Sequence, residues 1–266
     1  MTEDDSADPS DPKFVTALAR GLAILRAFRR DEISLPNQAL AQRTGLPRPT
    51  VTRLTYTLCR LGYLVQDAGG DYRLGPGVLA LGYGVLAGID LRRRAEVELA
   101  ALCEGDNPNV AAALGERYGQ SVVYLITHRS PSSVAMTFHM GAQVPLFLSS
   151  IGRAALMALP EAEQETLLDA ARRLSPDQAR RLTEGLERAR RDFATHGYCT
   201  SFGEWRAEIN GIAAPVPAAQ GGRAHAVNVG GFAFLNPREA LQETYAPRLL
   251  RAVHNLALRP MDMDDD

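Results

Sequence analysis

The chain has 266 residues, with 29 basic and 31 acidic side chains and a formal net charge of -2. Its hydrophobic fraction of 45% and charged fraction of 23% are ordinary for a globular protein, and the length suggests two domains. No run of about 18 apolar residues occurs, the acidic N-terminus lacks a signal-peptide core, and three cysteines give neither a disulfide framework nor a CxxC metal pair. We therefore expect a protein of the reducing cytoplasm with no membrane segment, no metal and no cofactor.

The charges are distributed unevenly along the chain. Residues 1–12 carry five acidic and no basic side chains, and residues 261–266 carry four acidic ones. Residues 13–77 carry ten basic and four acidic side chains, a net charge of +6, whereas residues 78–260 are close to neutral. A basic module at one end of a neutral body suggests a nucleic-acid-binding end.

The basic module has the pattern of three helices. A first helix is predicted over residues 14–30 from four apolar residues at helical spacing, namely Leu18, Leu22, Leu25 and Phe28. A short second helix follows and ends at Gly45, whose conformational freedom suits a tight turn. A third helix begins within residues 46–50, where proline is tolerated, and runs to about Arg60. Its expected buried stripe consists of Val51, Leu54, Leu58 and Leu61.

A short helix, a glycine turn and an amphipathic helix form a helix-turn-helix, whose second helix enters the major groove of DNA. Residues 62–66 and 71–74 are predicted to be strands of a β-hairpin wing around a glycine-rich turn. The candidate DNA contacts are the residues opposite the buried stripe or at its start, plus one on the wing: Arg48, Pro49, Thr50, Thr52, Arg53, Tyr56 and Arg73. Arg48 and Arg53 could read guanine edges or hold phosphates, and a solvated surface is the alternative for each single residue.

Several segments resemble one known family. Residues 39–54 (ALAQRTGLPRPTVTRL) and 57–64 (TLCRLGYL) resemble the DNA-binding half of IclR-type transcriptional regulators, as do residues 19–25 and 72–77. Residues 150–156 (SIGRAAL) are similar to an element of that family's effector domain. A second effector-domain signature is similar to His196-Gly-Tyr198, Gly203-Glu204 and residues 211–216. The resemblance covers about residues 14–258.

The resemblance implies an α+β protein with an N-terminal winged helix-turn-helix, a linker helix and a C-terminal GAF-like α/β effector domain with an antiparallel sheet. It also implies a homodimer or tetramer whose binding to double-stranded DNA is controlled by a small ligand, as repressor or activator, often of a catabolic operon. Two winged helices of a dimer would occupy half-sites of a pseudo-palindromic operator. The expected divisions are an acidic tail (1–12), the winged helix (13–76), a linker and dimerisation helix (77–93), the effector domain (94–259) and a second acidic tail (260–266). The tails either discourage non-specific DNA binding or serve as solubilising disordered segments.

The body has a mixed α/β pattern of its own. Apolar residues 79–91 predict the linker helix, with Arg92 to Arg94 continuing it, and residues 95–104 predict a further helix. Strands are expected at residues 121–127, 134–139 and, centrally in the sheet, 224–231, and a helix at residues 151–159. Helices between Glu161 and Gly197 take their inner face from Leu167, Leu168, Leu174, Leu182 and Leu186.

Ser149 and Ser150 precede the helix of residues 151–159, and serine is a good N-cap. The first backbone N–H groups of a helix lack partners and can bind a carboxylate, although an ordinary capped helix is the alternative. The resemblance places the effector pocket at this loop, at Ser201 and at Asn228. The Asn228 amide could donate to a carboxylate and accept from a hydroxyl, unless a loop satisfies it. Residues 200–202 are neutral where many family members are acidic.

The candidate effector residues are Ser150, Ile151, Gly152, Ser201, Gly211, Asn228 and Gly230. The expected ligand is a small organic acid, with aromatic acids as one option. The sequence contains no HExxH, GxSxG or P-loop motif, so we expect no enzyme. Two alternatives stay open: a constitutive DNA-binding protein without a ligand, and an enzyme carrying a winged-helix module. A Cys199–His196 nucleophile and a zinc site of scattered Cys and His are weaker alternatives.

Overall fold

The computed structural model describes residues 11–29, 32–87, 91–105, 107–130, 139–171, 176–217 and 224–258. These residues belong to two compact units that divide between residues 89 and 90. Leu174, nearly all of the strand expected at residues 134–139 and most of both acidic tails lie outside the described residues. Within the described part, no helix is long and apolar enough to cross a membrane.

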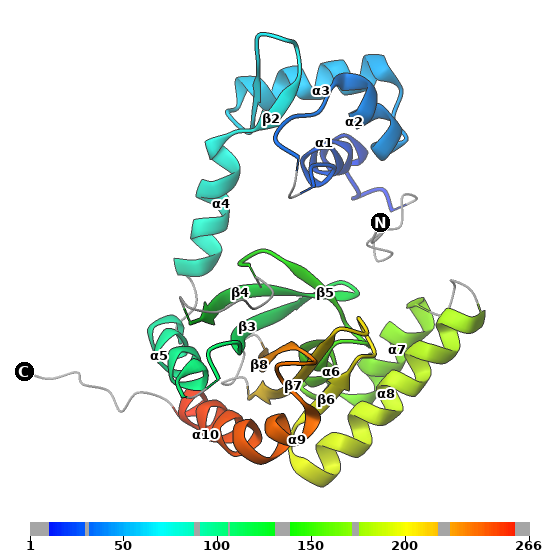
Figure 1. Ribbon diagram of the computed structural model, residues 1–266. Coiled ribbons are helices and arrows are strands. Elements are labelled where there is room, and N and C mark those ends of the chain that lie inside the picture. The colour runs from blue at the N-terminus through cyan, green and yellow to red at the C-terminus, as the bar shows by residue number, and fades with distance from the viewer. Residues whose placement is uncertain are drawn as a thin grey trace, which may run out of the picture. The chain divides into compact units, whose positions relative to one another are not determined.

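The N-terminal unit is a winged helix-turn-helix, as predicted (Figure 1). Its elements are α1 (Thr16–Arg26), α2 (Asn37–Thr44), α3 (Arg48–Arg60), β1 (Leu64–Gln66), β2 (Tyr72–Leu74) and α4 (Pro76–Ala87). The strands β1 and β2 pair antiparallel as the wing, and a bridge from Leu35 to Tyr72 attaches the chain before α2 to the wing. The core contains Ile24, Leu35, Leu40, Val51, Leu58, Leu64 and Tyr72.

The sequence analysis placed one apolar side chain of this unit wrongly, Leu61, and left open which side of α1 is buried. Leu18 and Leu22 of α1 are exposed, and Ile24 is the buried residue of that helix. Leu61 is also exposed, because α3 ends at Arg60 and Leu61 no longer follows the helical stripe. Thr55 takes the buried position, where its hydroxyl donates to the carbonyl of Val51 at 3.0 Å and so loses no hydrogen bond.

Glycine is required at two positions of this unit. Gly45, at the end of α2, has φ of 67°, the left-handed conformation that closes the turn into α3. A Cβ on Gly75 would lie 2.3 Å from the carbonyl oxygen of Gly62, so the chain entering α4 can pass the α3–β1 turn only as glycine. The start of α4 is therefore fixed against the wing. Arg92 to Arg94 do not continue α4, since they form the first turn of a separate helix, α5 (Arg92–Cys103).

The C-terminal unit is built on one antiparallel sheet in the order β5-β4-β3-β8-β7-β6. Its strands are β3 (Ala111–Tyr118), β4 (Ser121–Arg129), β5 (Gln143–Pro145), β6 (Cys199–Phe202), β7 (Ile209–Val216) and β8 (His225–Phe232). The strand β8 is central, as predicted. The sequence missed β3, because its alanine-rich AAALGERY lacks the β-branched residues typical of strands.

Helices cover both faces of this sheet (Figure 1). Helix α6 (Ser150–Met157) packs on one face, with α7 (Glu161–Ala171) and α8 (Pro176–His196) outside it. Helices α5 and α10 (Ala246–Ala257) pack together on the other face, after the short α9 (Arg238–Ala240) and a π-helical turn, Leu241–Tyr245. This helix-covered antiparallel sheet confirms the α+β prediction.

Candidate functional site

The predicted recognition helix presents one polar face. Arg48, Pro49, Thr52, Arg53 and Tyr56 are all exposed on α3, with Thr50 half-buried at the same end. Arg73 is exposed on β2 of the wing, opposite Val65 of β1. Arg60, which the sequence analysis did not single out, is exposed at 180° from Val51 on an ideal helix of about 100° per residue, and so shares this face.

Side-chain contacts fix this helix on its scaffold. The Thr52 hydroxyl accepts a hydrogen bond from the amide of Asn37 at 3.2 Å, which joins α2 to α3. Arg43 of α2 donates to the carbonyl of Ala27 at 2.9 Å and forms an ion pair with Glu32, so that it holds the α1–α2 connection. The hydrogen bond from Arg43 lowers the pKa of Glu32 to about 2. The polar face is therefore carried by a braced helix, as base and phosphate contacts require.

In the C-terminal unit, the N-terminus of α6 has two free donors. The Ser149 side chain caps the helix by accepting the N–H of Gly152 at 3.1 Å, and its hydroxyl donates to the carbonyl of Pro145 at 2.7 Å. The N–H groups of Ser150 and Ile151 have no hydrogen-bond partner among the described residues, although both residues are buried. Buried N–H groups without a partner are rare, and at a helix N-terminus they form a site for an anion.

The first turn of α6 lies directly over the centre of the sheet. A Cβ on Gly211 of β7 would lie 2.9 Å from the hydroxyl oxygen of Ser150, and one on Gly115 of β3 would lie 3.0 Å from Cδ1 of Ile151. Strand β8 runs between these two strands. Because Asn228 is two residues from Gly230, the β8 partner of Gly211, it faces the same side of the sheet as α6.

Asn228 has an unpaired hydrogen-bond acceptor on the side of the sheet that α6 covers. It is 4% exposed, its amide shares a hydrogen bond with the buried Tyr124 hydroxyl, and its Oδ1 has no partner among the described residues. Burial raises the pKa of Tyr124, so its hydroxyl stays protonated. Within the described ranges, no loop satisfies Oδ1 of Asn228. An unpaired buried acceptor is costly, and a ligand that donates a hydrogen bond would remove the cost.

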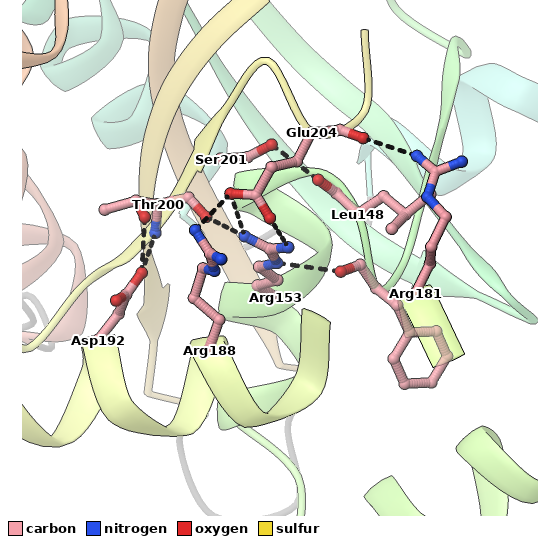
Figure 2. Close-up of polar contacts among 9 residues, drawn as sticks. Leu148, Arg153, Arg181, Arg188, Asp192, Thr200, Ser201 and Glu204 are labelled. Carbon is pink, nitrogen blue, oxygen red and sulfur yellow. Dashed lines mark hydrogen bonds and ion pairs between the residues drawn. The ribbon is translucent and has the colours of Figure 1, made fainter. Parts of the chain in front are cut away.

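The other candidate effector residues have structural roles. The Ser201 hydroxyl donates to the carbonyl of Leu148 at 2.7 Å (Figure 2). A Cβ on Gly152 would lie 2.2 Å from the carbonyl oxygen of Leu146, and one on Gly230 would lie 2.3 Å from that of Asn210. Close backbone packing is thus the role of Gly152 and Gly230, and a hydrogen bond from Ser201 ties β6 to the loop before α6. The unpaired polar groups belong to Ser150, Ile151 and Asn228.

Sequence reasoning missed the buried Arg153 and its ion pair with Glu204, 2.5 Å apart, on the α8 side of α6 (Figure 2). The residues are 51 positions apart, and the only local sign was the arginine inside the SIGRAAL segment. Tyr124 was missed as well, because nothing near it in sequence marks it as a polar partner of Asn228.

The cysteine and metal alternatives find no support among the described residues. Cys199 is fully buried, and its thiol donates to the carbonyl of Ala189 at 3.7 Å. Burial raises the pKa of this thiol, so it is not an activated nucleophile. His196 instead stacks on Tyr198, and no group of three or more metal-ligating side chains occurs in the described ranges.

Comparisons with known proteins bear on both units. The family model of the IclR helix-turn-helix domain matches residues 17–68, and that of the bacterial transcriptional regulator IclR C-terminal region matches residues 83–260. The HTH-type transcriptional regulator TsaQ1/TsaQ2 of Comamonas testosteroni is 30% identical over 95% of this chain and 91% of its own. The Pca regulon regulatory protein of Pseudomonas putida is 30% identical over 92% of this chain and 84% of its own.

A solved structure adds agreement of fold. The crystal structure of an IclR family transcriptional regulator from Brucella abortus is 42% identical, with a TM-score of 0.83 over 95% of both chains. The relatives named here are regulators, which agrees with the expectation that the chain is no enzyme. The chain therefore belongs to the IclR family of bacterial transcriptional regulators.

Proposed function

We propose that this regulator binds a pseudo-palindromic operator through α3 and the wing and changes its DNA affinity when a small organic acid binds beneath α6. It would act in the cytoplasm on a catabolic operon. The face of Arg48, Thr52, Arg53 and Tyr56 supports the first part, within a module of net charge +6. Arginine side chains on a helix that enters the major groove can read guanine or hold phosphate.

The unpaired polar groups around the first turn of α6 carry the effector part of the proposal. The N–H groups of Ser150 and Ile151 suit a carboxylate, and the positive end of the helix dipole favours its charge. The unpaired Oδ1 of Asn228 suits a hydroxyl or amine on the same ligand. These groups point to a carboxylic acid that also carries a hydrogen-bond donor.

One relative suggests a probe. An IclR homologue from Microbacterium hydrocarbonoxydans, 22% identical and with a TM-score of 0.69, was solved in complex with 4-hydroxybenzoate. At that identity the likeness is one of fold, but 4-hydroxybenzoate combines a carboxylate with a hydroxyl donor. It is therefore the first ligand to test here.

A dimer or tetramer is also proposed. Helix α4 is apolar along its length and exposes Leu79, Leu81, Tyr83 and Val85, a surface that a second copy would cover. Two copies would present two recognition helices to half-sites spaced by about 10 base pairs or a multiple.

Thermal denaturation with a panel of small acids tests the effector proposal. The panel pairs 4-hydroxybenzoate and other hydroxy acids with benzoate, which lacks the donor, and with 4-hydroxybenzamide, which lacks the charge. A ligand at 100 times its dissociation constant stabilises the folded protein by about 2.7 kcal/mol. We expect an acid with a donor to stabilise the wild type more than either matched compound. Absence of stabilisation by every acid would overturn the effector proposal.

A further inference from the structure

Arg153 is the centre of a polar network on the α8 side of α6 (Figure 2). It is fully buried, and its guanidinium donates in three directions. Nε donates to the carbonyl of Phe147 at 3.0 Å, and Nη1 donates to the carbonyl of Thr200 at 2.6 Å. Nη1 and Nη2 also donate to the two carboxylate oxygens of Glu204 at 3.2 and 2.5 Å. Only a planar guanidinium can satisfy this set at once.

Two of these acceptors lie on the segments that place the first turn of α6. Phe147 belongs to residues 145–149, the segment that runs from the end of β5 through a loop into the helix. Thr200 belongs to the edge strand β6, whose next residue, Ser201, donates to the carbonyl of Leu148 in the same loop. A Cβ on Gly185 of α8 would lie 2.4 Å from the carbonyl oxygen of Phe147, so α8 closes over the loop. The loop is thus held between α6, β6 and α8.

Glu204 is fixed in turn by α8. Arg188 donates to its carboxylate at 3.3 Å, and Arg181 donates to its carbonyl at 3.2 Å. Burial acts to raise the pKa of Glu204, but the hydrogen bond and charge of Arg153 and the charge of Arg188 outweigh it and lower the pKa. The group is therefore a carboxylate that fixes the orientation of the guanidinium.

Side chains of α8 and α6 also hold the edge strand β6 at Thr200. Asp192 of α8 accepts both the N–H of Thr200 at 3.0 Å and its hydroxyl at 2.6 Å, while Arg153 takes the carbonyl of Thr200. Both backbone groups of Thr200 are thus occupied by side chains. Strand β6 can shift only if these contacts break, and the loop before α6 would shift with it.

We propose that Arg153 and Glu204 are the positioning pair of the effector site: they fix residues 145–149 so that the free N–H groups of Ser150 and Ile151 stay aimed at the ligand. This inference rests on the proposed effector site. Neither residue touches the ligand. Both act on the site through the loop, and an anion site made of backbone N–H groups depends on exact backbone placement.

Hydrogen–deuterium exchange of the full chain tests the pair without any ligand. In Arg153→Met, we expect the amides of residues 146–153 to exchange at least about tenfold faster. A tenfold change corresponds to the smallest loss expected when a hydrogen bond to a charged group is removed. Strands β3 and β8 should keep the wild-type rates. Arg190→Met is the matched control, because Arg190 bonds α8 to Gln164 and Glu165 of α7 and, among the described residues, forms no hydrogen bond or ion pair with the loop.

Two exchange results would overturn the proposal. One is wild-type exchange over residues 146–153 in Arg153→Met. The other is a uniform rise over the whole C-terminal unit, which would make the pair a general structural cross-link. If Arg153→Met does not fold, Glu204→Gln replaces it, since it removes the charge and keeps one acceptor oxygen; the same two results apply.

Titration with 4-hydroxybenzoate provides the second readout, followed through the amide NMR signals of Ser150 and Ile151. We expect the probe to bind Arg153→Lys at least tenfold more weakly than the Arg190→Met control, because lysine lacks the planar fork. Equal affinity would contradict the positioning role. If the wild type does not bind the probe, the exchange result still decides the positioning of the loop, so failure of the effector proposal and failure of this inference remain distinguishable.

Discussion

Arg94 and Arg248 cap each other's helices. Arg94, in the first turn of α5, donates to the carbonyls of Asn255 and Leu256 at 3.2 and 3.3 Å and to that of Leu258, at the end of α10. Arg248, near the start of α10, donates to the carbonyls of Ala101 and Glu104 at the end of α5. The last carbonyls of a helix lack partners and carry the negative end of its dipole, so each arginine stabilises the other's helix.

This reciprocal arrangement predicts two independent losses of stability. Arg94→Ala and Arg248→Ala should each lower the free energy of unfolding by about 1 kcal/mol, because each leaves helix-end carbonyls without a donor. The two contacts lie at opposite ends of the helix pair, so the double variant should show the sum within about 0.5 kcal/mol. Urea denaturation measures all three. The control is Arg93→Ala, next to Arg94 but exposed; an equal loss in the control would refute the capping role.

The Glu32–Arg43 pair predicts a dependence of stability on pH. The folded-state pKa of Glu32 is about 2, against an ordinary 4.5, so the carboxylate contributes to stability above pH 4.5 and the contribution is lost as the pH falls towards 2. The melting temperature of the wild type should therefore exceed that of Glu32→Gln near pH 6, and the gap should close as the pH is lowered. A gap that stays constant from pH 6 to pH 2.5 would contradict this assignment.

Arg53 should contribute to DNA binding mainly through charge. If it holds a phosphate, Arg53→Ala should weaken binding to a duplex selected from random DNA and reduce the salt slope by about one unit. Arg191→Ala, an exposed arginine on α8, serves as the control. Unchanged affinity and slope in Arg53→Ala would remove it from the contact surface. Arg60→Ala applies the same test to Arg60, which the structure, but not the sequence analysis, placed on the polar face of α3.

Because Oδ1 of Asn228 has no partner in the described part of the chain, removing this side chain should cost little stability or raise it, but should abolish ligand binding. Replacing both Asn228 by Leu and Tyr124 by Phe removes the buried polar pair together, a change that is near neutral or stabilising when both partners go. We expect the free energy of unfolding to stay within about 1 kcal/mol of wild type or to rise, while binding of 4-hydroxybenzoate is lost. Retained binding would show that the ligand does not use Asn228.

Local patterns predicted the winged helix well, since its helices and hairpin depend on short-range signals such as Gly45 and the glycine-rich turn between β1 and β2. Periodicity could not say which side of α1 is buried, because Ile24 and the exposed Leu18 both lie on apolar stretches. The site was predicted only in part. Ser149 and Ser150 mark the start of α6 locally, but the Arg153–Glu204 pair and the Tyr124–Asn228 contact join residues far apart in sequence. Such pairs form only when the sheet and α8 are assembled.

The most direct test of an effector-controlled regulator is its DNA affinity with and without a bound acid. Fluorescence anisotropy of a selected duplex should be measured at fixed salt, with the wild type and with Ser150→Trp, whose side chain is too large for the close packing of Ser150 against Gly211. We predict that a saturating acid changes the wild-type dissociation constant for DNA by about 5- to 150-fold and leaves that of Ser150→Trp unchanged. An acid that binds the wild type without changing its DNA affinity would contradict the account.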